Sequence, residues 1–155
     1  MQGVVRWLYL MALIVWLGEL VFFSFVVAPK LFGAFPVEEA GRAVGAIFPI
    51  YYRVGYGCGV VLLGGSLLFL RSVDLRTWWG VNAAVVAVML AATLYAGLRI
   101  LPRATALRPQ IHAADAPQSV KDEFSRLHRL SVQLNGVVLL GGIAVSVITA
   151  AALRP

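Results

Sequence analysis

The sequence predicts an all-α integral membrane protein, a four-helix transmembrane bundle. Of its 155 residues, 61% are apolar and only 13% are charged, whereas a soluble domain is usually about a quarter charged. A bilayer core ~30 Å thick is crossed by a helix of roughly 20 apolar residues. Uncharged runs of that kind cover residues 7–29 (interrupted only by Glu19), 54–70, 77–98 and 130–153. We therefore expect one transmembrane domain over residues 1–155, with the lipid bilayer as its solvent.

The first spanning helix is expected over residues 4–28. Pro29 cannot continue the hydrogen-bond ladder, and Lys30 can reach the lipid headgroups. Residues 36–47 then repeat apolar side chains at helical spacing, with Pro36 at the first position. Such an amphipathic segment typically lies on the membrane surface, so we predict a short interfacial helix there.

The second and third spanning helices are expected over residues 51–70 and 78–101. The short link 71–76 makes these two helices antiparallel neighbours. Gly55 and Gly59 form a GxxxG pair in the second helix. In lipid such pairs let helix backbones approach closely, so we predict that both glycines face another helix.

A polar linker over residues 102–118 precedes the fourth helix, which we expect over residues 119–153. Ser119 suits its N-cap, and Asp122 lies in the first turn, where the helix dipole favours an acid. No breaker follows Val120. This helix is longer than the bilayer requires, so we predict that its first turns form a cytoplasmic extension.

The distribution of basic residues predicts the orientation. The side that holds both termini and the 71–76 link carries four of them: Arg6, Arg71, Arg76 and Arg154. The other side carries nine: Lys30, Arg42, Arg53, Arg99, Arg103, Arg108, Lys121, Arg126 and Arg129. The positive-inside rule then places both termini outside a bacterial inner (cytoplasmic) membrane. Because the basic residues flank apolar spans, they indicate lipid contacts, and no nucleic-acid partner is expected.

Five polar residues are candidates for a ligand or proton pocket on the cytoplasmic side: Glu19, Arg53, Arg99, His128 and Asn135. Glu19 is the only carboxylate in the spans, where a charge costs about 2.5–3.5 kcal/mol on insertion scales. Desolvation disfavours its charged form, so we expect a protonated acid that donates to Asn135. His128 and Asn135 are seven residues apart and share a helix face.

Each candidate also has a purely structural interpretation. Glu19 can hold helices together through a hydrogen bond to Asn135, Asn82 or Tyr95. Arg53 and Arg99 can anchor the chain at the headgroups, and a histidine at the water boundary is most often solvated.

Established enzyme motifs are absent from the sequence. It contains no HExxH, nucleophile elbow, P-loop or dinucleotide fingerprint, and the single Cys58 excludes an intramolecular disulfide. Haem b within a bundle usually takes two axial ligands, and only His128 lies near the membrane. A bis-histidine haem site in one chain is therefore disfavoured, which leaves His128 as the one candidate metal or haem ligand.

Several ordered motifs resemble the transmembrane protein 205-like family. They are Trp16-Leu17-Gly18, Phe22-Phe23-Ser24-Phe25-Val26-Val27-Ala28-Pro29-x-Leu31-Phe32, Ala40-Gly41, Phe48-Pro49-x-Tyr51-Tyr52 and Phe124-x-x-Leu127-His128-x-Leu130-Ser131-x-x-Leu134-Asn135. That family is largely of unknown function and is similar to copper-resistance protein D-like four-helix membrane proteins. The resemblance implies metal or xenobiotic handling and points to Pro29, Pro49, Tyr51, Tyr52, His128 and Asn135. Glu19 departs from the expected pattern.

Three functional hypotheses follow. The first is a non-enzymatic membrane protein that acts by helix association, as a homo-oligomer or an accessory subunit of a larger complex. The second is a transporter or a metal- or small-ligand-binding protein that uses the cytoplasmic-side pocket. The third is a haem-binding redox subunit with His128 as a ligand.

Overall fold

The computed structural model describes residues 2–70, 76–111, 113 and 115–152. This part of the chain is helical throughout its regular elements, and four of its helices are long and apolar enough to cross a membrane. The predicted fold class is thus confirmed. The elements are α1 (Gln2–Phe22), η1 (Phe23–Val27), α2 (Ala28–Ala34), α3 (Val37–Phe69), α4 (Arg76–Tyr95), η3 (Ala96–Ile100), α5 (Leu101–Ile111) and α6 (Gln118–Ala152).

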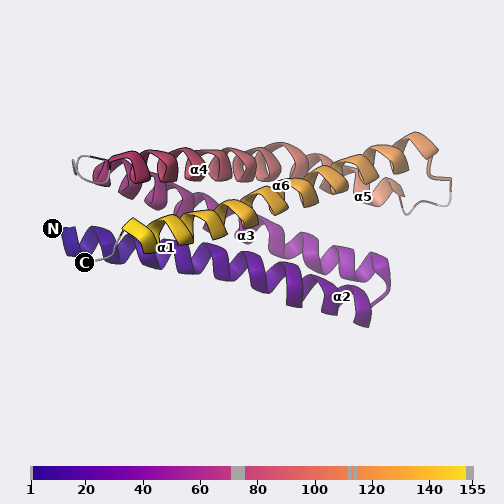
Figure 1. Cartoon of the computed structure of the whole chain (residues 1–155). Helices are drawn as coiled ribbons and strands as arrows, with labels where there is room; N and C mark the ends of the chain where they lie inside the picture. Colours follow the sequence, from indigo (N-terminus) through magenta and orange to yellow (C-terminus); the bar gives the residue numbers. More distant parts are fainter. Residues whose placement is uncertain (1, 71–75, 112, 114, 153–155) are drawn as a thin grey trace.

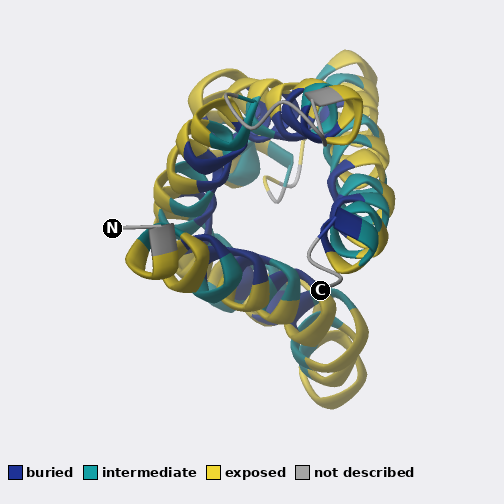
Figure 2. Cartoon of the chain, turned by 60° about the vertical axis from the view of Figure 1, so that its left-hand side comes forward, coloured by how far each residue is buried: buried dark blue, intermediate teal, exposed yellow. Residues whose placement is uncertain are grey.

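The four rods run up and down to form one elongated bundle, with both chain ends at the same end of the molecule (Figure 1). Helix α3 packs on α1 and α4, and α6 packs on α4 and α1, so the rods form a closed ring. Viewed toward that end, the buried residues face the inside of the ring and the exposed residues face outward (Figure 2). Large apolar side chains such as Phe25, Val60 and Leu140 are exposed on the outside, as expected where lipid is the solvent.

The rods are longer than a bilayer requires. The candidate spans contain 32 to 35 residues. At 1.5 Å per residue such a helix is about 50 Å long, roughly 20 Å more than the hydrocarbon core. At one end of the molecule α2 turns into α3, and α5 is followed by α6. There the pair α2 and α3 diverges from the pair α5 and α6 (Figure 1).

Pro29 and Pro102 do not end their helices, contrary to the predicted boundaries at residues 28 and 101. Each follows a π-helical segment, η1 or η3, and the rod continues to Ala34 or Ile111. A proline ring collides with the carbonyl group four residues earlier. In both rods that carbonyl belongs to the wider π turn, which takes up the collision and lets the helix continue.

The predicted interfacial helix over residues 36–47 is wrong as a separate element. It forms the first turns of α3, which continues through Pro49 to Phe69. Ala40 and Val44 of its apolar stripe are buried in the bundle. This part of the stripe packs against protein, whereas Val37 and Ile47 are exposed.

The remaining boundaries agree with the prediction more closely. The fourth helix, expected over residues 119–153, runs from Gln118 to Ala152. Helix α5 replaces most of the predicted linker over residues 102–118 and packs against the first turns of α6. Residues 71–75, most of the predicted link between the second and third spans, lie outside the described residues.

Small residues let the rods approach closely. A Cβ atom at Gly59 would lie 2.7 Å from Leu90 and 3.2 Å from Trp16, and one at Gly55 would lie 3.0 Å from both Thr93 and Trp16. Both glycines are buried. The GxxxG face of α3 is therefore in contact with α1 and α4 of the same chain.

Candidate functional site: a cleft at one end of the bundle

A buried polar network joins all four rods near the end that holds the termini. The Tyr9 hydroxyl donates to Oδ1 of Asn82 at 2.9 Å, and the Ser66 hydroxyl lies 3.0 Å from the same oxygen. Nδ2 of Asn82 donates to Oγ1 of Thr149 at 3.3 Å. All four side chains are at most 2% exposed. Because lipid offers no hydrogen-bond partners, such a network fixes the rods against one another.

A second network lies toward the other end and is centred on Asn135 of α6. The Tyr51 hydroxyl of α3 donates to Oδ1 of Asn135 at 2.7 Å, and Nδ2 of Asn135 donates to Oγ of Ser24 at 3.0 Å. Ser24 belongs to the π-helical segment η1. The amide of Asn135 therefore links three rods at the depth where η1 replaces regular α-helix.

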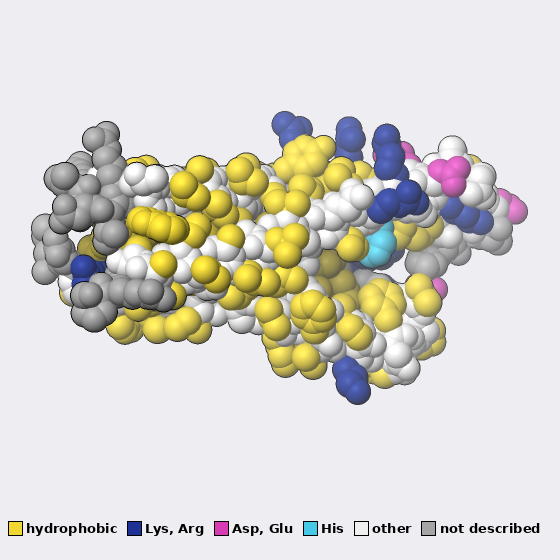
Figure 3. Space-filling view, viewed as in Figure 1, with side chains coloured by type: hydrophobic (Ala, Val, Ile, Leu, Met, Phe, Trp, Pro, Cys, Tyr) yellow, Lys and Arg dark blue, Asp and Glu magenta, His cyan; other side chains and the backbone are white. Residues whose placement is uncertain are grey.

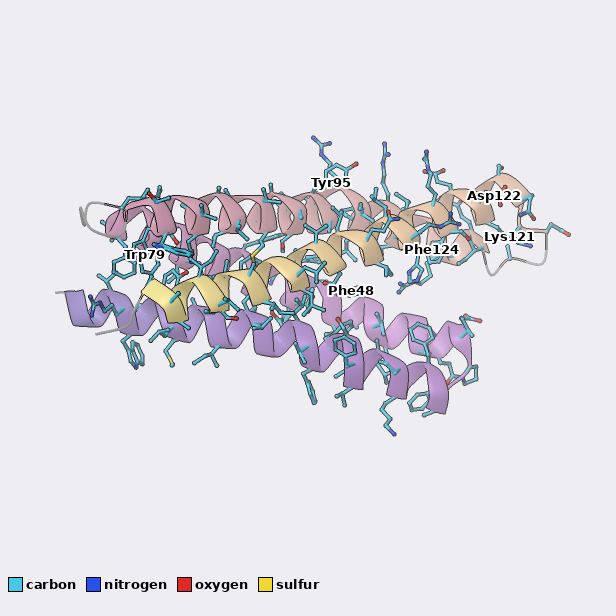
Figure 4. The ribbon with its side chains drawn as sticks, viewed as in Figure 1. Phe48, Trp79, Tyr95, Lys121, Asp122 and Phe124 are labelled. Carbon is cyan, nitrogen blue, oxygen red and sulfur yellow. The ribbon has the colours of Figure 1, made fainter. Side chains whose placement is uncertain are left out.

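Beyond this network the rods diverge and enclose a cleft between α3, α5 and α6. We call this the end cleft. Its lining is composed of Phe48, Tyr52, Ile100, Leu101, Ala104, Arg108, Phe124, Leu127, His128 and Ser131. Figure 3 shows the molecule hollowed between the diverging rods at this end, and Figure 4 shows Phe124 on α6 and Phe48 on α3, on opposite sides of it.

The end cleft has room for a small polar group. Its volume is about 50 Å³, which corresponds to roughly three or four water-sized spheres. A smaller inner cavity of about 10 Å³ lies next to Tyr51 and Asn135 and shares Tyr52 and Ser131 with the cleft. Its size suits about one water molecule. The polar lining therefore continues from the cleft inward to the Asn135 network.

Arg108 differs from the other basic residues at this end of the bundle. It is half-buried, whereas the following eight are exposed: Lys30, Arg42, Arg53, Arg99, Arg103, Lys121, Arg126 and Arg129. The guanidinium of Arg108 lies against Gly45 of α3, where a Cβ atom would collide with it. Pro49, four residues after Gly45, has no N–H to bond the Gly45 carbonyl. The missing side chain of Gly45 thus leaves space on α3 that the Arg108 guanidinium occupies.

The end cleft is electropositive. Its described lining contains Arg108 and His128 and includes no Asp or Glu. Its remaining polar side chains, Tyr52 and Ser131, are hydroxyls that can donate a hydrogen bond. The arrangement favours a ligand group that is negatively charged and rich in acceptors.

The structure brings only part of the predicted pocket together. His128 lines the end cleft and Asn135 lines the inner cavity. Arg53 and Arg99 are exposed and line neither cavity, because their helix faces point away from the bundle.

The predicted hydrogen bond between Glu19 and Asn135 is wrong. Both ends of the Asn135 amide are occupied by Tyr51 and Ser24. Glu19 lies within electrostatic range of Tyr51 and Cys58, and its buried Oε2 has no hydrogen-bond partner among the described residues. The alternative partner Tyr95 is exposed, and Asn82 is bonded to Tyr9.

Sequence reasoning missed Arg108 as a site residue because the predicted linker removed it from the bundle. The related sequence feature is Gly45, whose missing side chain leaves space on α3 for the Arg108 guanidinium. Ser131 was also missed, although it lies three residues after His128 and therefore on the same helix face.

The described residues show no cluster of side chains that supports the metal hypothesis. In the described ranges, no group of three or more His, Cys, Asp or Glu side chains is arranged to hold a metal ion. His112, the second histidine of the chain, lies outside the described residues.

Comparisons with known proteins place the chain in a family without assigned function. The family described as "Domain of unknown function (DUF4149)" matches residues 11–113. An uncharacterized protein of Aquifex aeolicus (strain VF5) is 44% identical over 50 residues, which are 32% of this chain and 35% of that protein. No solved structure matches. These matches do not show the resemblance to the transmembrane protein 205-like family, which stays an expectation.

Proposed function

This chain belongs to the DUF4149 family, and we propose that it is a membrane protein that binds a small ligand in the end cleft. The observation that supports this proposal is the composition of the cleft. Arg108, His128, Tyr52 and Ser131 line a cleft whose other lining residues are apolar. A few converging polar groups in a mostly apolar concave site are typical of small-molecule binding sites.

The two π-helical segments support the same location. Ala96 of η3 lines the inner cavity, Ile100 of η3 lines the end cleft, and Ser24 of η1 holds Asn135. Single π turns within α-helices occur frequently at functional sites. Both of these turns lie beside the cavities.

Binding is favoured over transport in this conformation. The polar lining reaches Asn135 and then meets a packed half-bundle. There Tyr9, Phe69 and Trp79 contact one another edge to face or tilted, with ring centroids 4.5–5.9 Å apart. A solute that entered from the end cleft would find no open path through this aromatic cluster.

Helix association is the alternative function, and the structure weakens the argument for it. Its clearest sequence signal was the pair Gly55 and Gly59, which is in contact with Trp16, Leu90 and Thr93 of the same chain. That face is therefore not available to a second copy. A binding role needs no partner chain.

Filling the end cleft tests the proposal. Ala104 lines the cleft, whereas Ala106 on the same helix is exposed and does not. We expect native mass spectrometry of the protein purified from membranes to show a small-molecule adduct. Ala104→Phe should remove the adduct, because the new ring occupies the cleft, and the matched variant Ala106→Phe should retain it.

Two outcomes contradict the proposal. One is a wild-type protein that carries no adduct under mild detergent conditions. The other is an adduct that persists equally in Ala104→Phe and Ala106→Phe, since the molecule would then bind elsewhere.

A further inference from the structure

We infer that the end cleft takes the headgroup of an anionic amphiphile, a phosphate or carboxylate attached to an alkyl chain, with Arg108 as its anion-binding residue. This inference rests on the proposed function and names the chemical class of the ligand. It is supported by the position of Arg108, by the donor character of the cleft and by the apolar walls beside it.

Arg108 lines the cleft, with its guanidinium against Gly45 of α3. Gly45 provides the space for this guanidinium, because a Cβ atom at that position would collide with it. A guanidinium has five N–H donors and can bind an oxyanion in a two-pronged manner. Since eight other basic residues at this end are exposed, Arg108 is the one placed to bind inside the bundle.

The other polar groups of the cleft favour an acceptor-rich ligand. Neutral histidine donates through one ring nitrogen, and the hydroxyls of Tyr52 and Ser131 donate through oxygen. With no carboxylate in the described lining, a cationic headgroup would meet the Arg108 guanidinium and no counter-charge. The cleft therefore discriminates against cations.

The size and walls of the cleft indicate an attached chain. A volume of about 50 Å³ accepts a headgroup and excludes a whole lipid. Phe48, Phe124 and Ile100 form apolar walls next to the polar groups. An alkyl chain can lie along these walls, where its apolar surface is removed from water. A free phosphate lacks this contribution and should bind far more weakly.

Three soluble probes test the ligand class. Dodecyl phosphate has the charge and the chain, inorganic phosphate has only the charge, and dodecyltrimethylammonium has the chain with the opposite charge. We expect dodecyl phosphate, added to the full-length protein in neutral detergent, to raise the Tm and to bind saturably. At equal concentration, inorganic phosphate and dodecyltrimethylammonium should leave the Tm unchanged.

A matched pair of glycine variants tests the role of Arg108 without altering any charge. In Gly45→Ala the new methyl group displaces the flexible guanidinium, so the fold is retained while the anion site is disturbed. Gly41, one turn away on α3, has no atom within 4 Å of a Cβ position. We expect Gly45→Ala and Arg108→Gln each to weaken dodecyl phosphate binding at least about tenfold, and Gly41→Ala to leave it unchanged.

The outcomes separate this inference from the proposed function. If Ala104→Phe abolishes dodecyl phosphate binding while Gly45→Ala and Arg108→Gln bind as the wild type does, the end cleft is a ligand site and Arg108 is not its anion-binding residue. If dodecyltrimethylammonium binds as tightly as dodecyl phosphate, the ligand class is wrong. If Ala104→Phe binds dodecyl phosphate normally, both the inference and the proposed function fail.

Discussion

Replacing Asn82 with Leu should measure how strongly the buried polar network ties the rods together. The substitution removes the amide and keeps an apolar side chain in the core. Three hydrogen bonds are lost, those with Tyr9, Ser66 and Thr149. Tyr9 and Thr149 lie 3.3 Å apart and can still bond each other, and Ser66 keeps the Leu62 carbonyl at 2.8 Å. No partner is therefore left unsatisfied.

The expected cost follows from that count. Hydrogen bonds between membrane helices average about 0.6 kcal/mol and reach about 1.7 kcal/mol, so three of them amount to roughly 2 kcal/mol and at most about 5 kcal/mol. Reversible unfolding in mixed micelles, followed by tryptophan fluorescence, measures the free energy of unfolding. Trp79 contacts Tyr9 and thus reports on this part of the core.

Ser146→Ala is a suitable control for Asn82→Leu. The Ser146 hydroxyl donates only to the Ile143 carbonyl of its own helix, at 2.7 Å, so its loss should change stability by less than about 0.5 kcal/mol. If Asn82→Leu is as stable as Ser146→Ala, the network does not hold the rods together and our reasoning about the core is refuted.

Two further predictions concern packing and orientation. Gly65→Ala should destabilise the protein by about 1–3 kcal/mol, because the new methyl group would lie 2.8 Å from the Tyr9 ring. The adjacent Gly64→Ala, with no atom within 4 Å of its Cβ position, should be neutral or slightly stabilising. Equal thermal stability of the two variants would contradict the packing of α3 on α1. A reporter fused to the C-terminus should be active only outside the cytoplasm, because the side that holds the termini carries four basic residues and the other side carries nine. Activity confined to the cytoplasm would reverse the predicted orientation.

The four spans were predictable from sequence because hydropathy and length alone determine whether a helix can cross a bilayer. The helix ends were less predictable. Pro29 was expected to end the first helix, and the third helix was expected to end at residue 101, but a π turn before Pro29 and before Pro102 lets each helix continue. Whether a proline ends a helix depends on how neighbouring turns adjust, which no local sequence rule states.

The candidate site depended on how each helix is rotated about its axis. His128 and Asn135 line the cavities, as expected from their common face, whereas Arg53 and Arg99 face outward. Rotation is determined by packing, such as that of Gly55 and Gly59 against Trp16. Glu19 could not be paired from sequence for the same reason.

Arg108 illustrates a second limit of sequence reasoning. Its contact with Gly45 joins residues far apart in the chain, and it forms only because α5 continues beyond Pro102 and packs beside α6. Once the third helix is expected to end at residue 101, Arg108 belongs to a linker and its position against α3 cannot be anticipated.

The central claim is that the end cleft is a ligand site, and an experimental structure of the protein with dodecyl phosphate in lipid nanodiscs tests it most directly. We expect density for the headgroup between Arg108 and His128, with the alkyl chain leaving along Phe48 and Phe124. An end cleft that is empty or closed by its own side chains, with the probe bound only to exposed basic residues such as Arg53 or Arg99, would contradict it.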